Sequence, residues 1–251
     1  MSNYLWGRGF QFHRSSGKKH EYWVKEGQSN EDPLVVMTGF GVGIVGYYMF
    51  VKELINHFPN RTIILFETSY VNLKPAASVI TETDSLCEVD DMFLDLKLDK
   101  CTLMAHSFGT FIAGWIAKHR PHYISKLVLV DPVCFRTWDA SFYQTMFRQP
   151  PDSLESKAYQ ILLASGPIVS LGLARHMNWF GSILFPEQIT VPTQIFLAEN
   201  DFLLDPAGLH SYLQHRIAKD TLSHIEITTM DTCRGFFQLI PKWNGNIIGA
   251  L

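Results

Sequence analysis

Residues 105–109, Ala-His-Ser-Phe-Gly, directly follow a short apolar run at 101–104. They place a serine with a small residue two positions before it and another two positions after it. An apolar segment follows at 110–119 and ends before Pro121. A strand, a small-x-Ser-x-Gly turn and a helix form a nucleophile elbow, whose tight turn lifts the serine hydroxyl clear of the sheet. The helix N-terminus at the turn favours developing negative charge. We therefore predict that Ser107 is a nucleophile. The alternative is a serine that only caps the helix.

Such a nucleophile also needs hydrogen-bond donors for the charge that develops on the substrate oxygen. The backbone N–H of Phe108, the residue after the serine, is the first candidate. Gly39, Phe40 and Gly41 follow another apolar run, and glycines there let the backbone approach a ligand closely. We expect the second donor to be the N–H of Phe40. The alternative is that this Gly-rich turn only connects a strand to a helix.

A serine hydroxyl is a weak nucleophile unless a histidine takes its proton and a carboxylate orients that histidine. The chain order in this layout is serine, acid, histidine. An acidic segment at 199–206 follows a predicted strand at 193–197. We choose Asp201 as the acid, because Asp205 precedes Pro206 and is better explained as a helix N-cap. Asp131, after the strand at 126–130, is a weaker candidate for the same role.

Strands and helices alternate along the chain, and they form the frame that must hold these residues. The predicted strands are 10–14, 21–25, 34–38, 63–66, 101–104, 126–130, 193–197 and 224–230, and the predicted helices are 47–58, 79–98, 110–119 and 206–217. The run at 34–38 is almost entirely apolar, as a strand buried on both faces is. The alternation predicts an α/β fold with a mostly parallel sheet covered by helices.

The segment 134–189 breaks this alternation. It is rich in aromatic residues: Phe135, Trp138, Phe142, Tyr143, Phe147, Tyr159, Trp179, Phe180 and Phe185. We expect a core made of residues 1–133 and 190–251, with a helical lid inserted at 134–189. An aromatic underside favours an apolar or acyl-bearing ligand. The alternative is an ordinary helical excursion whose aromatic side chains pack on the main core.

Between residue 34 and about residue 239 the chain resembles the α/β-hydrolase superfamily. The stretches MAHSFGTFIAGW, LVDPVCF, RHMNWFGSILF and FLAENDFLLDP are similar to those of uncharacterised single-domain members, many of fungal type. The resemblance implies the α/β-hydrolase fold with a lid insertion. It also implies an esterase- or lipase-like serine hydrolase that acts on an ester, thioester or amide, and it calls for no cofactor or metal.

The family commonly carries His-Gly-x-Phe after its last strand, and this histidine is the base. Here the segment 231–237 reads Asp-Thr-Cys-Arg-Gly-Phe-Phe, so Arg234 stands where the histidine is expected. A guanidinium stays protonated near neutral pH and cannot act as a base. It can pair with Asp201 or bind an anionic ligand. Loss of the base is expected to lower the rate by several orders of magnitude.

None of the ten histidines follows the last predicted strand. His106 neighbours the serine, but an elbow directs its side chain away from the Ser107 hydroxyl. His224 begins the last strand, at the far edge of the sheet. His176, in the predicted lid, is the remaining minor candidate for a base.

The composition argues against several other classes of protein. Charged residues make up 18% of the chain and the net charge is −3, so nothing favours binding to nucleic acid. The four cysteines form no CxxC motif and are expected to be reduced thiols. No apolar run is long enough to span a bilayer, and the N-terminus does not read as a signal peptide. We expect an intracellular, cytoplasmic protein with a small apolar ester or acyl substrate. Membrane association through a segment upstream of this chain stays open.

Three explanations of Arg234 remain. The protein is a serine hydrolase with another base or with low activity. It is a catalytically dead pseudohydrolase that binds a ligand or a partner. Or the chain differs from a working ancestor by one His-to-Arg change. We favour a hydrolase whose activity is impaired by Arg234, with the pseudohydrolase as the alternative.

Overall fold

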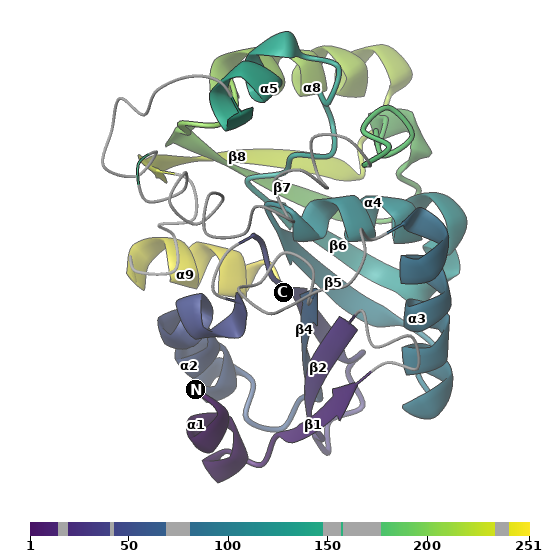
Figure 1. Ribbon diagram of the computed structural model, residues 1–251, viewed down its shortest axis with the longest axis vertical. Coiled ribbons are helices and arrows are strands. Elements are labelled where there is room, and N and C mark those ends of the chain that lie inside the picture. The colour runs from purple at the N-terminus through teal and green to yellow at the C-terminus, as the bar shows by residue number, and fades with distance from the viewer. Residues whose placement is uncertain (15–19, 41–42, 69–80, 148–156, 158–176, 234–240) are drawn as a thin grey trace.

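An eight-stranded sheet runs through the computed structural model in the order β1-β2-β4-β3-β5-β6-β7-β8 (Figure 1). The structure describes residues 1–14, 20–40, 43–68, 81–147, 157, 177–233 and 241–251. The strands are β1 (Gln11–Arg14), β2 (His20–Lys25), β3 (Leu34–Met37), β4 (Ile63–Thr68), β5 (Cys101–His106), β6 (Ile124–Val130), β7 (Thr193–Asn200) and β8 (Ile225–Cys233). Only β1–β2 and β2–β4 pair antiparallel, and the pairs from β4 across to β8 are parallel. This confirms the predicted mostly parallel sheet.

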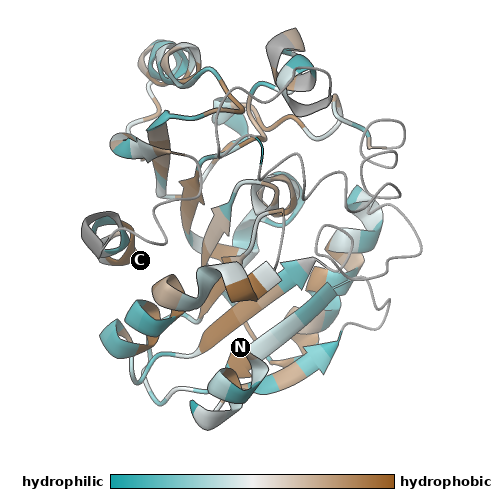
Figure 2. Cartoon of the chain, turned by 60° about the vertical axis from the view of Figure 1, so that its left-hand side comes forward, coloured by the Kyte–Doolittle hydropathy of each residue, from teal (hydrophilic) through white to brown (hydrophobic). Residues whose placement is uncertain are grey.

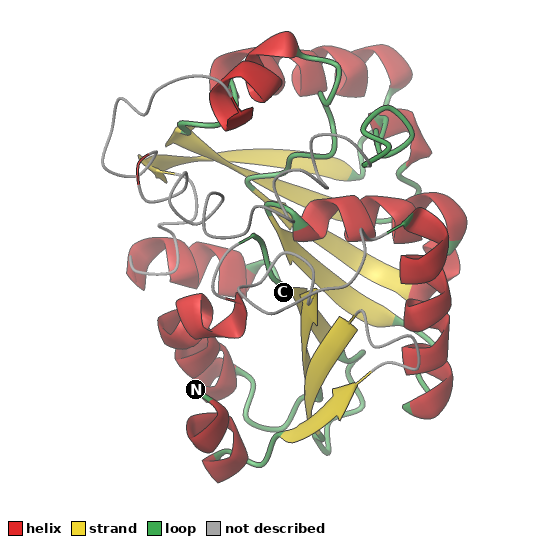
Figure 3. Cartoon of the chain, in the orientation of Figure 1, coloured by secondary structure: helices red, strands yellow, loops and turns green. Residues whose placement is uncertain are grey.

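Helices cover both faces of the sheet (Figure 3). On one face α3 (Glu82–Asp95), α4 (Gly109–His119) and α8 (Pro206–Asp220) contribute to a single apolar cluster. On the other face α1 (Ser2–Gly7), α2 (Tyr48–His57) and α9 (Pro241–Gly249) contribute to a second cluster. The sheet is therefore the middle of three layers, as its parallel strands require.

The strand β3 shows why the central strands are apolar throughout. Val35 and Met37 belong to the cluster beneath α3 and α4, whereas Leu34 and Val36 belong to the cluster beneath α2. All four side chains are buried, and full burial of one such side chain contributes about 1.5–3 kcal/mol. In Figure 2 much of the central sheet is accordingly brown, whereas the surrounding helices show teal residues.

The chain leaves β3 and β5 toward opposite faces of the sheet. The segment after β3 leads to α2, in the second cluster, and the segment after β5 leads to α4, in the first cluster. β3 and β5 are neighbours, so their carboxyl ends form a topological switch point. Open α/β sheets bind ligands in the crevice at such a point. The Gly-rich turn follows the end of β3 and Ser107 follows the end of β5, so both lie at this switch point.

Most elements begin or end within a few residues of the predicted positions, and three differences bear on the prediction. The strand β8 continues to Cys233, so the prediction that 231–233 form a loop is wrong: the pairing with β7 extends the strand beyond Met230. The predicted helix at 47–58 is a 3₁₀ helix, Gly43–Tyr47, followed by α2. The short helices α1 and α9 were not predicted, because each contains glycine and asparagine and has little apolar periodicity.

Part of the segment 134–189 lies outside the described residues, namely 148–156 and 158–176. Its described part includes α5 (Ala140–Phe147). Phe135 and Phe142 are buried in the first cluster and Trp179 packs against it, whereas Trp138 and Phe180 are exposed. The lid and the division of the chain into core and insertion remain predictions.

Among the residues that the structure describes, no helix has the length and apolarity that crossing a membrane takes. No group of three metal-ligating side chains is found there either.

Candidate active site

Ser107 occupies the sharp turn between β5 and α4. Its φ is 48°, in the left-handed region, which costs a non-glycine residue about 1–2 kcal/mol. The turn is held from two sides: the Ser107 N–H donates to the Val130 carbonyl (3.0 Å), and the Ser107 carbonyl accepts from the Thr110 N–H (3.0 Å) and hydroxyl (2.5 Å). Strain that the surroundings enforce in this way is typical of functional positions.

Two glycines explain how closely the turn packs. A Cβ on Gly109 would lie 2.8 Å from the Thr38 carbonyl oxygen and 2.9 Å from that of Met37. A Cβ on Gly39 would lie 2.9 Å from His106 Nδ1 and 3.0 Å from Ser107 Cβ. The end of β3 and the Ser107 turn thus touch, and only glycine fits at both contacts.

The N-terminus of α4 begins at Phe108, which is its N-cap residue, and no side chain caps it. Phe108 is buried, with its ring edge-on to Phe111 at 5.5 Å between centroids. Phe40, half-buried, packs against the same cluster as Phe108. Both predicted oxyanion donors therefore belong to the segments that leave the sheet at the switch point, while Gly41 lies outside the described residues.

The side chain of His106 is held behind the turn. Its Nδ1 is 2.5 Å from the Tyr47 hydroxyl, and its Nε2 is 3.7 Å from Asp131 Oδ2. The Tyr47 hydroxyl also accepts a hydrogen bond from the Gly39 N–H at 2.7 Å. Burial raises the pKa of Tyr47, so its hydroxyl stays protonated. The two His106 nitrogens thus face Tyr47 and Asp131.

Asp131 follows β6 and is almost completely buried. Its φ is 46°, and its N–H donates to the Phe196 carbonyl (2.9 Å). Its Oδ1 accepts from the Ala198 N–H (2.9 Å), and Oδ2 is the atom that faces His106. The carboxylate therefore ties β6 to β7 and lies against the His106 ring.

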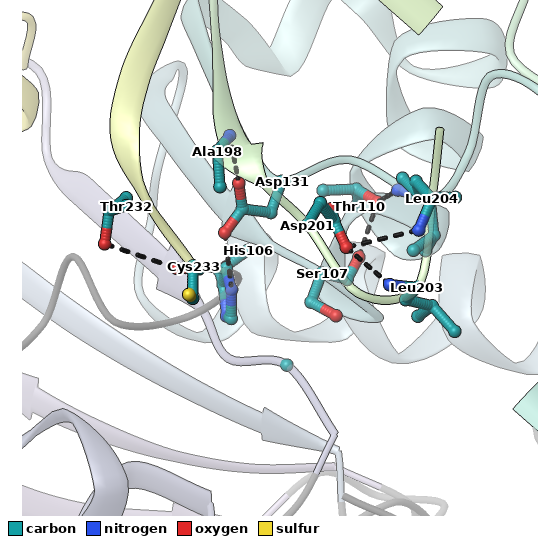
Figure 4. Close-up of polar contacts among 12 residues, drawn as sticks. His106, Ser107, Thr110, Asp131, Ala198, Asp201, Leu203, Leu204, Thr232 and Cys233 are labelled. Atoms are coloured by element: carbon teal, nitrogen blue, oxygen red, sulfur yellow. Dashed lines mark hydrogen bonds and ion pairs between the residues drawn. The ribbon is translucent and has the colours of Figure 1, made fainter. Parts of the chain in front are cut away.

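Asp201 follows β7 and shapes its own loop. Its Oδ1 accepts from the N–H groups of Leu203 (2.8 Å) and Leu204 (3.2 Å). Asp205 accepts from the Gly208 N–H (3.0 Å) as the N-cap of α8, which confirms its predicted structural role. Figure 4 shows Asp201, Ser107, His106 and Asp131 in one region, at the carboxyl ends of β5, β6 and β7.

The position of Arg234 is approached from β8. Cys233, the last residue of β8, pairs with Asn200, the residue before Asp201. The strands β7 and β8, which lead to Asp201 and Arg234, are therefore paired up to Asn200 and Cys233. Arg234 itself and His176 lie outside the described residues. His224 precedes the first residue of β8, at the opposite end of the strand from Cys233, and its Nε2 is 2.7 Å from the Ile189 carbonyl oxygen.

Sequence reasoning missed Tyr47. It is 59 residues away from His106 in the chain, and nothing in its local pattern indicates a contact with the Gly-rich turn. Only the packing of the 3₁₀ helix Gly43–Tyr47 over the end of β3 and β5 brings the three groups together.

The chain was compared with known proteins. The family model described as alpha/beta hydrolase fold matches residues 32–162. The sn-1-specific diacylglycerol lipase ABHD11 of Danio rerio is 24% identical over 110 residues, which are 44% of this chain and 34% of that protein. The 1-acylglycerol-3-phosphate O-acyltransferase ABHD5 of Sus scrofa is 29% identical over 112 residues, 41% of this chain and 30% of that protein. The match thus spans about a third of the length of these curated relatives.

A solved structure extends the likeness to the whole fold. The crystal structure of a putative aryl esterase from Burkholderia cenocepacia superposes with a TM-score of 0.66 at 12% identity, covering 96% of this chain and 97% of that chain. At this identity the superposition shows that the folds agree.

Proposed function

The chain belongs to the α/β-hydrolase family, and from this premise we propose that it is an esterase- or lipase-like serine hydrolase with Ser107 as its nucleophile and a turnover limited by Arg234. One observation carries the proposal. Ser107 is held in a left-handed conformation at the switch point, with Gly39 packed against it and an N-terminus of α4 that no side chain caps. Backbone strain of this kind clusters at functional sites, and here it is combined with the close packing of the loop that follows β3.

In the proposed reaction the Ser107 oxygen attacks the acyl carbon of the substrate. The N–H groups of Phe108 and Phe40 donate to the oxyanion that forms, the alcohol leaves, and water then releases the acid. Asp201 takes the position of the acid. With a guanidinium instead of an imidazole at position 234, the serine proton passes to water or hydroxide, so acylation is slow.

The aromatic side chains beside the turn support an apolar acyl group as the substrate. Phe108, Phe111, Trp179 and Phe142 follow one another edge to face, at centroid separations of 5.5, 5.7 and 5.6 Å. Two of these four side chains come from the segment 134–189, which we propose is a lid over the core of residues 1–133 and 190–251. The relatives are named for acylglycerol substrates, which points the same way.

A second candidate function rests on the sequence at position 234. Arginine cannot supply the proton transfer that a serine hydrolase needs, so the site around Ser107 can bind a ligand without turnover. In this pseudohydrolase the same acyl ligand is held, and the guanidinium contributes a positive charge for a carboxylate or phosphate.

A fluorophosphonate probe, which reacts only with an activated serine, distinguishes the two candidates. We expect the unmodified protein to be labelled slowly, Ser107→Ala not to be labelled, and Arg234→His to be labelled at least about 100-fold faster than the unmodified protein. Ser223→Ala, at an exposed serine before β8, is the matched control and should keep the original rate. If Arg234→His is labelled and the unmodified protein is not, the pseudohydrolase is supported. If Ser107→Ala is still labelled, both candidate functions are contradicted.

A further inference from the structure

The contacts of Tyr47 reach beyond the residues of the proposed reaction. We propose that Tyr47 is a positioning residue that fixes the oxyanion loop, defined as residues 38–40, against the Ser107 turn through a buried chain of polar groups. This proposal rests on the proposed function of Ser107. It assigns to Tyr47, His106 and Asp131 a task in the reaction although none of them touches the substrate.

The first link is the hydrogen bond from the Gly39 N–H to the Tyr47 hydroxyl, at 2.7 Å. Gly39 is the residue whose missing side chain makes room for Ser107. Its amide is directed at the Tyr47 hydroxyl, and the next residue along the loop, Phe40, is the one whose amide the proposed function takes as the oxyanion donor. Tyr47 thus fixes the residue before the proposed donor.

The second link is the 2.5 Å contact between the Tyr47 hydroxyl and His106 Nδ1. A phenol carries one hydrogen, and its oxygen already accepts from Gly39. In our proposal the hydroxyl donates that hydrogen to Nδ1, and the His106 ring then has no hydrogen on Nδ1 and carries one on Nε2.

The third link runs from His106 to Asp131. The Nε2 that then bears the hydrogen lies 3.7 Å from Asp131 Oδ2, and Oδ1 of the same carboxylate accepts from the Ala198 N–H. Tyr47, His106 and Asp131 are all buried, so little water competes for these contacts. The chain of groups connects the oxyanion loop to β5, β6 and β7, the strands that carry Ser107, Asp131 and Asp201.

These contacts predict how removal of the Tyr47 hydroxyl changes the reaction rate. In Tyr47→Phe the ring keeps its place, but Gly39 and His106 lose the oxygen between them. The Phe40 amide is then held less well where the oxyanion forms, which affects the transition state more than the bound substrate. We expect kcat and the rate of phosphonylation to fall by about 10-fold to 100-fold, with KM changed less than about twofold.

The kinetic test compares the unmodified protein, Tyr47→Phe and Tyr48→Phe. Tyr48 is the adjacent tyrosine, exposed at the start of α2, and its variant should keep the original rates. Each variant is also made in the Arg234→His background, so that a slow parent reaction does not hide the effect. Equal rates for Tyr47→Phe and its parent in both backgrounds overturn the proposal, as does a rise in KM that accounts for the whole loss.

A second measurement is independent of activity. Nitrogen-15 spectra of the unmodified protein should show a neutral His106 with its hydrogen on Nε2, and the Gly39 amide resonance should shift in Tyr47→Phe but not in Tyr48→Phe. A hydrogen on Nδ1, or a Gly39 resonance unchanged in Tyr47→Phe, overturns the chain of contacts. If no variant reacts with the probe while the spectra agree, the proposed function fails and the role of Tyr47 in catalysis fails with it, but the chain of contacts stands.

Discussion

Ser107 and Asp131 adopt the same left-handed backbone conformation, with φ of 48° and 46°, at the carboxyl ends of the adjacent strands β5 and β6. Each N–H donates to a carbonyl of the strand or strand end beside it: Ser107 to Val130, and Asp131 to Phe196. The other two non-glycine residues with positive φ in the described part of the chain, Lys97 and Thr221, lie at the ends of α3 and α8, where this conformation is common. At the candidate site, in contrast, the left-handed residues Ser107 and Asp131 follow the ends of strands.

The conformation of Asp131 predicts different outcomes for two substitutions. Asn tolerates the left-handed region and keeps an oxygen for the Ala198 N–H, so Asp131→Asn should change the free energy of unfolding by less than about 1 kcal/mol. Asp131→Ala leaves that buried N–H without its acceptor and should lower the free energy of unfolding by about 2 kcal/mol or more. Urea unfolding measures both. Equal losses would show that the charge facing His106, not the hydrogen bond to Ala198, is what stabilises the fold.

Gly39 offers a steric test of the contact between the oxyanion loop and the Ser107 turn. A methyl group there would lie 2.9 Å from His106 Nδ1 and 3.1 Å from the Tyr47 oxygen, so the loop must move. We expect Gly39→Ala to lower the rate of fluorophosphonate labelling by about 100-fold, because small displacements of catalytic groups cost that much. Gly245→Ala is the control: its methyl group meets nothing within 4 Å, and in α9 it should add about 0.5–1 kcal/mol of stability. An unchanged rate in Gly39→Ala would argue against oxyanion donors in this loop.

Local rules predicted the parts of the site that depend on neighbours in sequence. The continuous apolar run of β3, the Ser107 turn and the Asp205 cap follow from periodicity, small residues and the Asp-Pro pair. The contacts of Tyr47 were not predictable, because they depend on the relative placement of three elements. The end of β8 was missed for a similar reason: Asp231 is a poor strand former, and only the renewed pairing of Cys233 with Asn200 of β7 shows that the strand continues past it.

Asp201 and Asp205 make similar hydrogen bonds to backbone N–H groups, yet we assign them different roles. In Asp201→Asn the side-chain oxygen still accepts from Leu203 and Leu204, so stability should hold while labelling of the Arg234→His variant falls by about 100-fold. In Asp205→Ala the cap of α8 is lost, which should cost about 0.5–2 kcal/mol of stability without lowering the labelling rate. Thermal unfolding and probe kinetics on the same samples separate the two effects. The reverse pattern would exchange the roles of the two residues.

Two buried cysteines make the fold sensitive to alkaline pH. Burial raises the pKa of the Cys101 and Cys134 thiols from near 9 to about 12. Between these values the unfolded chain releases protons that the folded chain retains, so the free energy of unfolding falls as the pH rises above about 9, and the contribution is fully present below it. Urea unfolding at a series of pH values measures the fall, which should be smaller in Cys134→Ala. Cys87→Ala, at an exposed free cysteine, is the control that should leave the profile unchanged.

The pH dependence of acylation tests whether Arg234 limits the reaction of Ser107. Without an imidazole the serine proton passes to hydroxide, so the labelling rate of the unmodified protein should rise by about tenfold per pH unit through the neutral range. In Arg234→His the rate should instead level off above a pH of about 6.5, where an unperturbed imidazole is neutral and can act as the base. Arg234→Ala removes the guanidinium without adding a base, and its profile should keep the slope of the unmodified protein. A plateau near neutral pH in the unmodified protein would mean that another histidine already serves as the base, and His176→Ala would then abolish that plateau if the base is in the segment 134–189.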